Sequence, residues 1–207
     1  MLVSNMATTL SGAGFFWAFL SMVTATLCCT GYYLPYWLHG TMLNATDVYF
    51  GTFRRCNYPR VDDDGAVVVV NECGRYTTLA DVPSLSWQIC AVVVGVGCGL
   101  LLLVGFTAIF ACCISDVVSK GAARVGGVLQ LLAGVLVAAG CALYPNGWNS
   151  REVMEACGQL SQAYKLGTCR ISWSYYMSCI GAVLSIICFC LSFKATRGKS
   201  TIYTARV

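Results

Sequence analysis

Among the residue types that can take part in chemistry, cysteine is the one that stands out in this chain. The 207 residues include 14 cysteines but only one histidine, His39. A thiol or hydroxyl nucleophile needs a nearby base, usually histidine, and zinc sites commonly draw on several histidines or on clustered cysteines. No C-x-x-C dithiol motif occurs, which argues against a membrane thiol oxidoreductase. We therefore expect no enzyme, no metal site, no cofactor and no small-molecule substrate.

Four cysteines form two pairs that lie between apolar stretches. Cys56 and Cys73 share one polar segment, and Cys157 and Cys169 share another. Four cysteines allow three connectivities, of which one disulfide per segment is the simplest. Each bridge would contribute about 3 kcal/mol in the loop-entropy model. Because disulfides form in oxidising compartments, both segments are expected to lie outside the cytosol.

Four long apolar stretches must position these segments. They span about residues 10–36, 87–115, 125–143 and 171–193, and none contains Asp, Glu, Lys or Arg. Each is near or above the roughly 20 residues that cross a bilayer core. The composition agrees, with 57% hydrophobic and 11% charged residues. The sequence predicts one tetraspan membrane domain whose charge-free helices carry no proton relay or ion pathway.

The basic residues near the apolar stretches indicate the orientation. They lie between the second and third stretches and after the fourth: Lys120, Arg124, Lys194, Arg197, Lys199 and Arg206. By the positive-inside rule, both termini are cytosolic and the loops 39–86 and 144–172 are outside. Basic residues at these places contact lipid headgroups, and we expect no nucleic-acid partner. The first stretch lacks a positive n-region and is expected to be retained as a signal anchor.

The first outer loop contains the pattern of a β-hairpin. Asp62 to Gly65 form a turn cluster, and the β-branched run 66–72 follows it. We predict that this run pairs with residues 48–55 and that the bridge from Cys56 to Cys73 joins the two strands.

Two positions predict covalent modification. Asn44, Ala45 and Thr46 form an N-glycosylation sequon in the first outer loop. Cys112 and Cys113 end the second stretch at the cytosolic membrane face, where S-palmitoylation occurs. The alternative for these cysteines is a packing role, as for the others within the helices.

Small residues recur one helical turn apart in three of the stretches. Such pairs let helix backbones approach closely in a membrane, so we expect packing within the bundle, with docking of a partner helix as the alternative. Gln130, an amide deep in a stretch, is expected to bond a neighbouring helix. The predicted packing residues are Gly95 and Gly99, Gly134 and Ala138, and Gly181 and Ser185.

Several motifs in the outer loops resemble a known family. Trp37, followed by Gly51, Phe53 and Cys56 and then Cys73, resembles the signature of the claudin and peripheral myelin protein superfamily. More specific segments resemble the lipoma HMGIC fusion partner-like family within it: PYW at 35–37, FGTFRRCNYP at 50–59, ECGRY at 72–76, CALYPNGW at 141–148 and LGTC at 166–169. The sequences of the FGTFRRC and ECGRY segments are most similar to the founding branch of that family.

The resemblance implies an all-α, claudin-like bundle of four transmembrane helices topped by a small extracellular β-sheet. Thr52 and Phe53 stand where claudins have Leu-Trp, which argues against claudin-type paracellular sealing. Relatives in the family resemble auxiliary subunits of ion-channel or receptor complexes at the plasma membrane. We therefore predict an accessory membrane protein. The alternatives are an adhesion or junction protein and, less favoured, a pore or transporter.

Arg54 and Arg55 are the predicted partner-binding residues. They adjoin Cys56 on the predicted strand, and neighbouring residues of a strand point to opposite faces. At least one of the two is therefore expected to be free for a partner. The alternative is an ion pair within the loop, with Asp62 to Asp64 or with Glu72.

Overall fold

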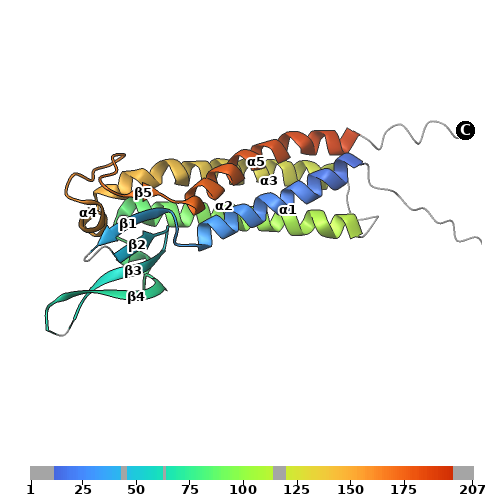
Figure 1. The fold of residues 1–207 in the computed structure, drawn as a ribbon. Helices are drawn as coiled ribbons and strands as arrows, with labels where there is room; N and C mark the ends of the chain where they lie inside the picture. Colours follow the sequence, from blue (N-terminus) through green and yellow to red (C-terminus); the bar gives the residue numbers. More distant parts are fainter. Residues whose placement is uncertain (1–11, 43–45, 63, 114–119, 198–207) are drawn as a thin grey trace, which may run out of the picture.

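Four long helices form the body of the protein, as the sequence predicts. The computed structural model describes residues 12–42, 46–62, 64–113 and 120–197. Within these ranges the helices are α1 (Gly12–Tyr33), α2 (Leu85–Cys113), α3 (Lys120–Leu143) and α5 (Trp173–Arg197). All four are long and apolar enough to cross a membrane. They run side by side, and a small β-sheet lies at one end of the bundle (Figure 1).

The first helix is shorter than its apolar stretch. It ends at Tyr33, and residues 34–37 form a turn that leads to the first strand. Pro35 explains this end, because a proline disfavours helical backbone at the residue before it.

Close contacts between the helices depend on residues without bulky side chains. A Cβ added at Gly181 of α5 would stand 2.2 Å from Cys28 Sγ of α1, and one at Gly134 of α3 would stand 3.0 Å from Ser185 Cβ of α5. A Cβ at Gly95 of α2 would stand 2.7 Å from the hydroxyl of Tyr32. These glycines therefore lie where helix backbones come close together.

Two of the predicted packing residues are exposed and not buried between helices. Gly99 is exposed, and an added Cβ there would meet nothing within 4 Å. Ala138 is also exposed. The residues in contact are Gly97, whose added Cβ would stand 2.8 Å from Val137 Cγ2, and Val137 itself. The prediction for Gly99 and Ala138 is wrong, because spacing along a helix does not determine where a neighbouring helix comes close.

A polar network joins three helices in the middle of the bundle. Trp17 Nε1 of α1 donates to Gln130 Oε1 of α3 at 3.1 Å, and Gln130 Nε2 donates to Ser21 Oγ of α1 at 2.7 Å. Ser185 Oγ of α5 donates to the backbone oxygen of Gln130. Gln130 is thus fully buried, with its side-chain amide bonded to α1 and its backbone oxygen to α5, as expected for an amide in apolar surroundings.

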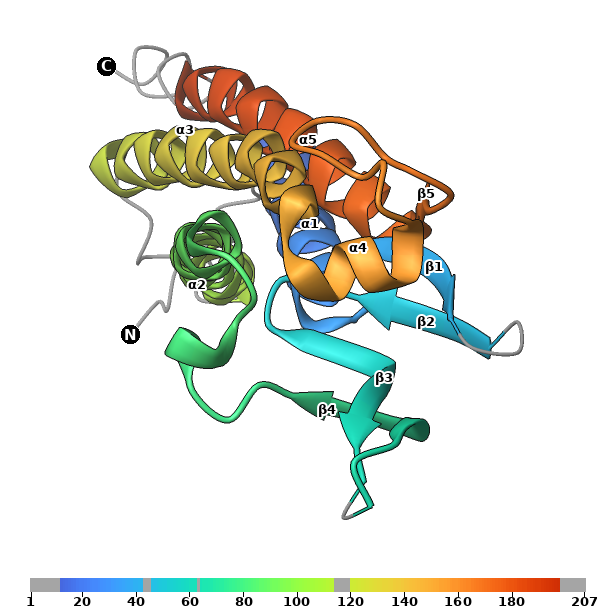
Figure 2. The same cartoon turned by 90° about the vertical axis from the view of Figure 1, so that its left-hand side faces the viewer.

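The outer loops build a five-stranded sheet. Its strands are β1 (Leu38–Met42), β2 (Thr46–Phe50), β3 (Arg54–Val61), β4 (Val67–Arg75) and β5 (Arg170–Ile171), in the order β4-β3-β2-β1-β5 with antiparallel pairing. Helix α4 (Arg151–Cys157) lies against β1 (Figure 2). Strand β5 comes from the second outer loop, so both loops contribute to one sheet.

The predicted hairpin exists with a different first strand. β4 pairs with residues 54–61 across the turn at Asp62 to Gly65, whereas residues 48–50 lie in β2, which does not pair with β4. The chain reverses between β2 and β3, where the Gly51 N–H donates to the Arg54 oxygen at 2.7 Å. Residues 48–55 are therefore parts of two strands, and the single strand predicted from the sequence wrongly included the turn between them.

An aromatic core joins the sheet to the bundle. The rings of Trp87 and Tyr144 stack with centroids 4.7 Å apart, and Trp37 packs edge-on against Tyr144 at 4.8 Å. Tyr144 donates its hydroxyl hydrogen to the Phe50 oxygen at 3.1 Å, and Trp37 Nε1 donates to the Gly31 oxygen at 2.7 Å. All four side chains are at most 1% exposed. This junction fixes the sheet on the helices.

Candidate functional site: the outer sheet and its contact with the bundle

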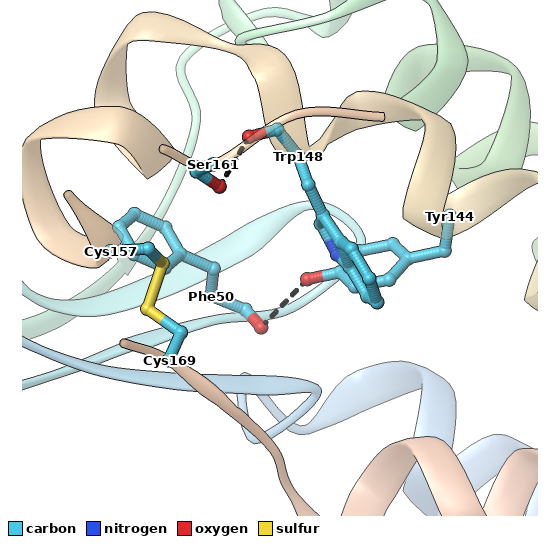
Figure 3. Close-up of a disulfide and its surroundings, with 6 residues drawn as sticks. All are labelled: Phe50, Tyr144, Trp148, Cys157, Ser161 and Cys169. Atoms are coloured by element: carbon cyan, nitrogen blue, oxygen red, sulfur yellow. Dashed lines mark hydrogen bonds between the residues drawn. A yellow bond between two sulfur atoms is a disulfide. The ribbon is translucent and has the colours of Figure 1, made fainter. Parts of the chain in front are cut away.

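Both predicted disulfides are present in the outer region. Cys56 and Cys73 face each other across β3 and β4 with Cα atoms 4.1 Å apart. Cys157 and Cys169 connect the end of α4 to the start of β5 (Figure 3), with Cα atoms 4.9 Å apart. Each bridge thus closes one loop, and neither links the two loops.

The second bridge packs directly against the sheet. A Cβ on Gly40 of β1 would stand 2.5 Å from Cys169 Sγ, so only glycine fits there without a shift. Near the bridge, Ser161 Oγ donates to the Trp148 oxygen at 3.0 Å (Figure 3). The second loop is therefore closed by its own disulfide, and it packs closely against β1.

Three residues of the motif in the first outer loop, Trp37, Gly51 and Phe53, lie where the sheet meets the helices. Trp37 is in the aromatic core described above. An added Cβ at Gly51 would stand 2.8 Å from Pro35 Cα, so the turn after β2 lies directly on the chain leaving α1. The Phe53 ring contacts the Tyr32 ring, with centroids 4.8 Å apart.

Arg55 connects the two outer loops. Its Nη1 atom lies 2.7 Å from Glu152 Oε1 on α4, and the two side chains are only 22% and 27% exposed. The guanidinium also stands over the rings of Tyr58 and Tyr76, at 4.1 and 4.6 Å from the centroids. Tyr76 donates its hydroxyl hydrogen to Glu152 Oε2 at 3.0 Å. Arg55 therefore has an intramolecular role, with a carboxylate of the other loop and not with those predicted in its own.

The hydroxyl of Tyr76 remains protonated in this cluster. Burial raises the pKa of Tyr76 well above its ordinary value, and the neighbouring Glu152 carboxylate raises it further. A neutral hydroxyl can donate to Glu152, whereas a phenolate beside it would repel the carboxylate. Glu152 thus accepts from Arg55 on one oxygen and from Tyr76 on the other.

Arg54 points away from this cluster, as expected of its neighbour on a strand. Its guanidinium carbon stands 4.5 Å from the ring centroid of Tyr33, at the end of α1. Its Nε atom is buried and has no hydrogen-bond partner. Arg54 also lies directly opposite Arg75 in the ladder between β3 and β4.

Strand β4 forms one edge of the sheet. In the described residues no strand pairs with its outer side, and Val68, Asn71, Glu72 and Arg75 are exposed along it. The hairpin of β3 and β4 extends away from the helix bundle (Figure 1). This edge offers backbone groups as well as side chains to a partner.

Sequence reasoning missed the residues that join the two loops. Glu152 and Tyr76 lie 97 and 21 positions from Arg55, and neither carries a local signal of the contact. The available signal was the type of residue, since a glutamate in the first turn of a short outer helix is a plausible partner for an arginine.

Two predicted modification sites lie outside the described part of the chain. Asn44 falls in the gap at residues 43–45, and the side chains of Cys112 and Cys113, at the end of α2, are likewise outside it. Glycosylation and palmitoylation stay predictions.

The chain is similar to proteins of one family along most of its length. A family model described as "Lipoma HMGIC fusion partner-like protein" matches residues 13–194. The human LHFPL tetraspan subfamily member 2 protein is 34% identical over 130 residues, which cover 62% of this chain and 57% of that protein. The Danio rerio LHFPL tetraspan subfamily member 3 protein is 28% identical over 181 residues, which cover 87% of this chain and 80% of that protein. The match with the human member 2 protein therefore spans less than two thirds of the relative's length.

Proposed function

Because this chain belongs to the lipoma HMGIC fusion partner-like family of tetraspan membrane proteins, we propose that it is a non-enzymatic accessory subunit of an ion-channel or receptor complex. In this proposal the protein lies in the plasma membrane with both termini in the cytosol. The partner binds the outer sheet, which the bundle holds at the membrane surface.

The exposed edge of β4 carries this proposal. A nine-residue edge strand is a ready site for strand addition, in which main-chain hydrogen bonds supply affinity and alternate side chains supply specificity. Soluble proteins usually protect such edges. Here the edge includes the exposed side chain of Val68, 41% accessible, on a hairpin that extends away from the bundle.

Rigidity of the outer region supports the same role. Each outer loop is closed by a disulfide, and the pair of Arg55 and Glu152 joins them. A preorganised surface loses little conformational entropy on binding, which favours a partner-binding role. Arg55 itself is engaged within the protein, so the partner-binding surface moves from the predicted pair of arginines toward the β4 edge.

Co-purification from native membrane tests the proposal. Wild type should recover a channel or receptor in stoichiometric amount, and Val68→Lys should lower that recovery because a charge at an edge opposes strand addition. Leu160→Lys is a matched control, since Leu160 is 77% exposed in the second outer loop and away from the β4 edge. Both variants should reach the cell surface as wild type does. Equal recovery by wild type and Val68→Lys would exclude the β4 edge as the binding surface.

The same edge favours a second candidate function. Two copies could pair their β4 strands antiparallel, with Glu72 of one near Arg75 of the other, as an adhesion or junction protein requires. Recovery of homotypic assemblies without a channel or receptor would favour this candidate. Conductance of the purified protein alone in liposomes would instead favour a pore.

A further inference from the structure

An open groove runs between α1 and α2 in the half of the bundle near the sheet. Its volume is about 560 Å³, and its lining, which includes Tyr33, Gly95, Gly99 and Leu102, is mostly apolar. The groove exists because α2 has glycines one turn apart on this face. Gly99 in particular leaves open space, since an added Cβ there would meet no atom within 4 Å.

One arginine stands at the sheet end of this groove, and a second lies beside it in the sheet. Arg54 lies over the ring of Tyr33, which itself lines the groove. Arg75 lies directly opposite Arg54 on β4, so both side chains leave the same face of the sheet. Like charges directly opposite each other in a ladder are destabilising, and an anion between them would relieve that repulsion. In the described part of the chain neither arginine forms an ion pair, and Nε of Arg54 is buried without a hydrogen-bond partner.

The arginines lie at the level where lipid headgroups are expected. Tyr33 ends α1, and Tyr36 stacks on Trp173 at the start of α5 with centroids 5.4 Å apart. Trp173 and Tyr176 are 49% and 53% exposed. Exposed Tyr and Trp at helix ends mark the membrane–water interface. The apolar groove therefore lies in the hydrocarbon region, and the arginines lie beside the phosphates.

We propose that this groove is a phospholipid site of the outer leaflet. An acyl chain lies along α2 over Gly95 and Gly99, and the lipid phosphate lies between Arg54 and Arg75. Arginine suits this task because its planar guanidinium donates paired hydrogen bonds to phosphate. A transmembrane helix of a partner protein fits the charges less well, because an apolar helix brings no anion to the two guanidinium groups.

Native mass spectrometry of the full chain in detergent tests the site. The probes are a palmitoyl-oleoyl phosphatidylcholine and the diacylglycerol with the same two chains, which lacks the phosphate. Wild type should retain the phospholipid about tenfold better than the diacylglycerol, since charge-assisted hydrogen bonds are among the stronger ones. Arg54→Gln combined with Arg75→Gln should abolish this preference.

A second variant tests the acyl-chain half of the site. Gly99→Leu fills the groove and should lower retention of both lipids. The matched controls are Arg170→Gln, an exposed arginine of the second loop, and Ala138→Leu, an exposed small residue of α3. Both controls should bind the phospholipid as wild type does.

Three results would overturn the proposal. The first is equal retention of the two lipids by wild type. The second is unchanged phospholipid binding in both the double arginine variant and Gly99→Leu, each shown by its thermal unfolding to be folded. The third is loss of a co-purifying membrane protein on Gly99→Leu while phospholipid binding persists, which would assign the groove to a partner helix.

Discussion

Removal of the Arg55 side chain should loosen the contact between the two outer loops. The Arg55→Ala variant loses a charge-assisted hydrogen bond, worth about 1.5–3 kcal/mol, and two cation–π contacts worth about 0.5–1 kcal/mol each. It also leaves Glu152 with only the hydroxyl of Tyr76. The side chains of the ion pair are about three quarters buried, so solvent screening lowers the total only modestly. We expect a loss of about 2–4 kcal/mol in the free energy of unfolding.

The assay is thermal unfolding in one fixed detergent, followed by tryptophan fluorescence. Trp37, Trp87 and Trp148 are all at most 5% exposed near the sheet, so the signal reports on this region. At roughly 2–4 °C per kcal/mol for a chain of this size, Arg55→Ala should lower Tm by about 4–16 °C. A double-mutant cycle with Glu152→Ala should give a coupling energy of about 1–3 kcal/mol.

Arg151→Ala is the matched control for this experiment. Arg151 also pairs with a glutamate, Glu155, at 3.0 Å, but its side chain is 90% exposed and the pair lies within one helix. Such pairs contribute no more than about 0.5 kcal/mol. If Arg55→Ala lowered Tm no more than Arg151→Ala does, or if the coupling energy were near zero, Arg55 would not join the loops and would again become a candidate for partner binding.

Three further predictions concern packing, orientation and cross-linking. Gly97→Ala should destabilise the bundle by about 1–3 kcal/mol through overpacking against Val137. Gly99→Ala should instead be neutral or stabilising by up to about 1 kcal/mol. Thermal unfolding compares the two variants directly, and equal effects on stability would contradict the packing assigned to the two glycines. Epitope tags at either terminus should be protected in intact cells, while a tag at the Asp64 turn should be accessible; surface labelling of an N-terminal tag would refute this orientation. Peptide mapping without reduction should recover one disulfide within each outer loop, and a bridge between the loops would contradict the structure.

The sequence predicted the parts of the fold that depend on local composition. A bilayer requires about 20 apolar residues per helix, so runs of that length located the four spans to within a few residues. The turn at Asp62 to Gly65 carried the Asp-Gly signal of a hairpin, and it is where the chain reverses between β3 and β4. The turn after β2 lacks such a signal, since Thr52 and Phe53 follow Gly51. For that reason the first strand of the hairpin was misplaced.

Long-range contacts and helix rotation could not be predicted in this way. Arg55 and Glu152 meet only because α4 folds back over the sheet, and no local pattern specifies that position. Likewise Gly95, Gly97 and Gly99 lie within five residues, and which of them packs depends on where α1 and α3 come close to α2. A strongly apolar helix gives little indication of its inward face, because the lipid-facing side is as apolar as the packed side.

The adjacent arginines divide the outer region into surfaces with different roles. Strand geometry directs Arg55 toward α4, where it pairs with Glu152. It directs Arg54 toward the end of α1, where the buried Nε atom of Arg54 has no hydrogen-bond partner. A substitution at Arg55 therefore disturbs the platform itself, and lost partner recovery in that variant would not locate a binding surface. Val68 lies near the tip of the hairpin, remote from both arginines along β3 and β4, so its variants test partner binding without altering the contact between loops or the membrane-level charge. Loss of partner recovery in Val68→Lys, together with wild-type lipid retention, would separate the two surfaces experimentally.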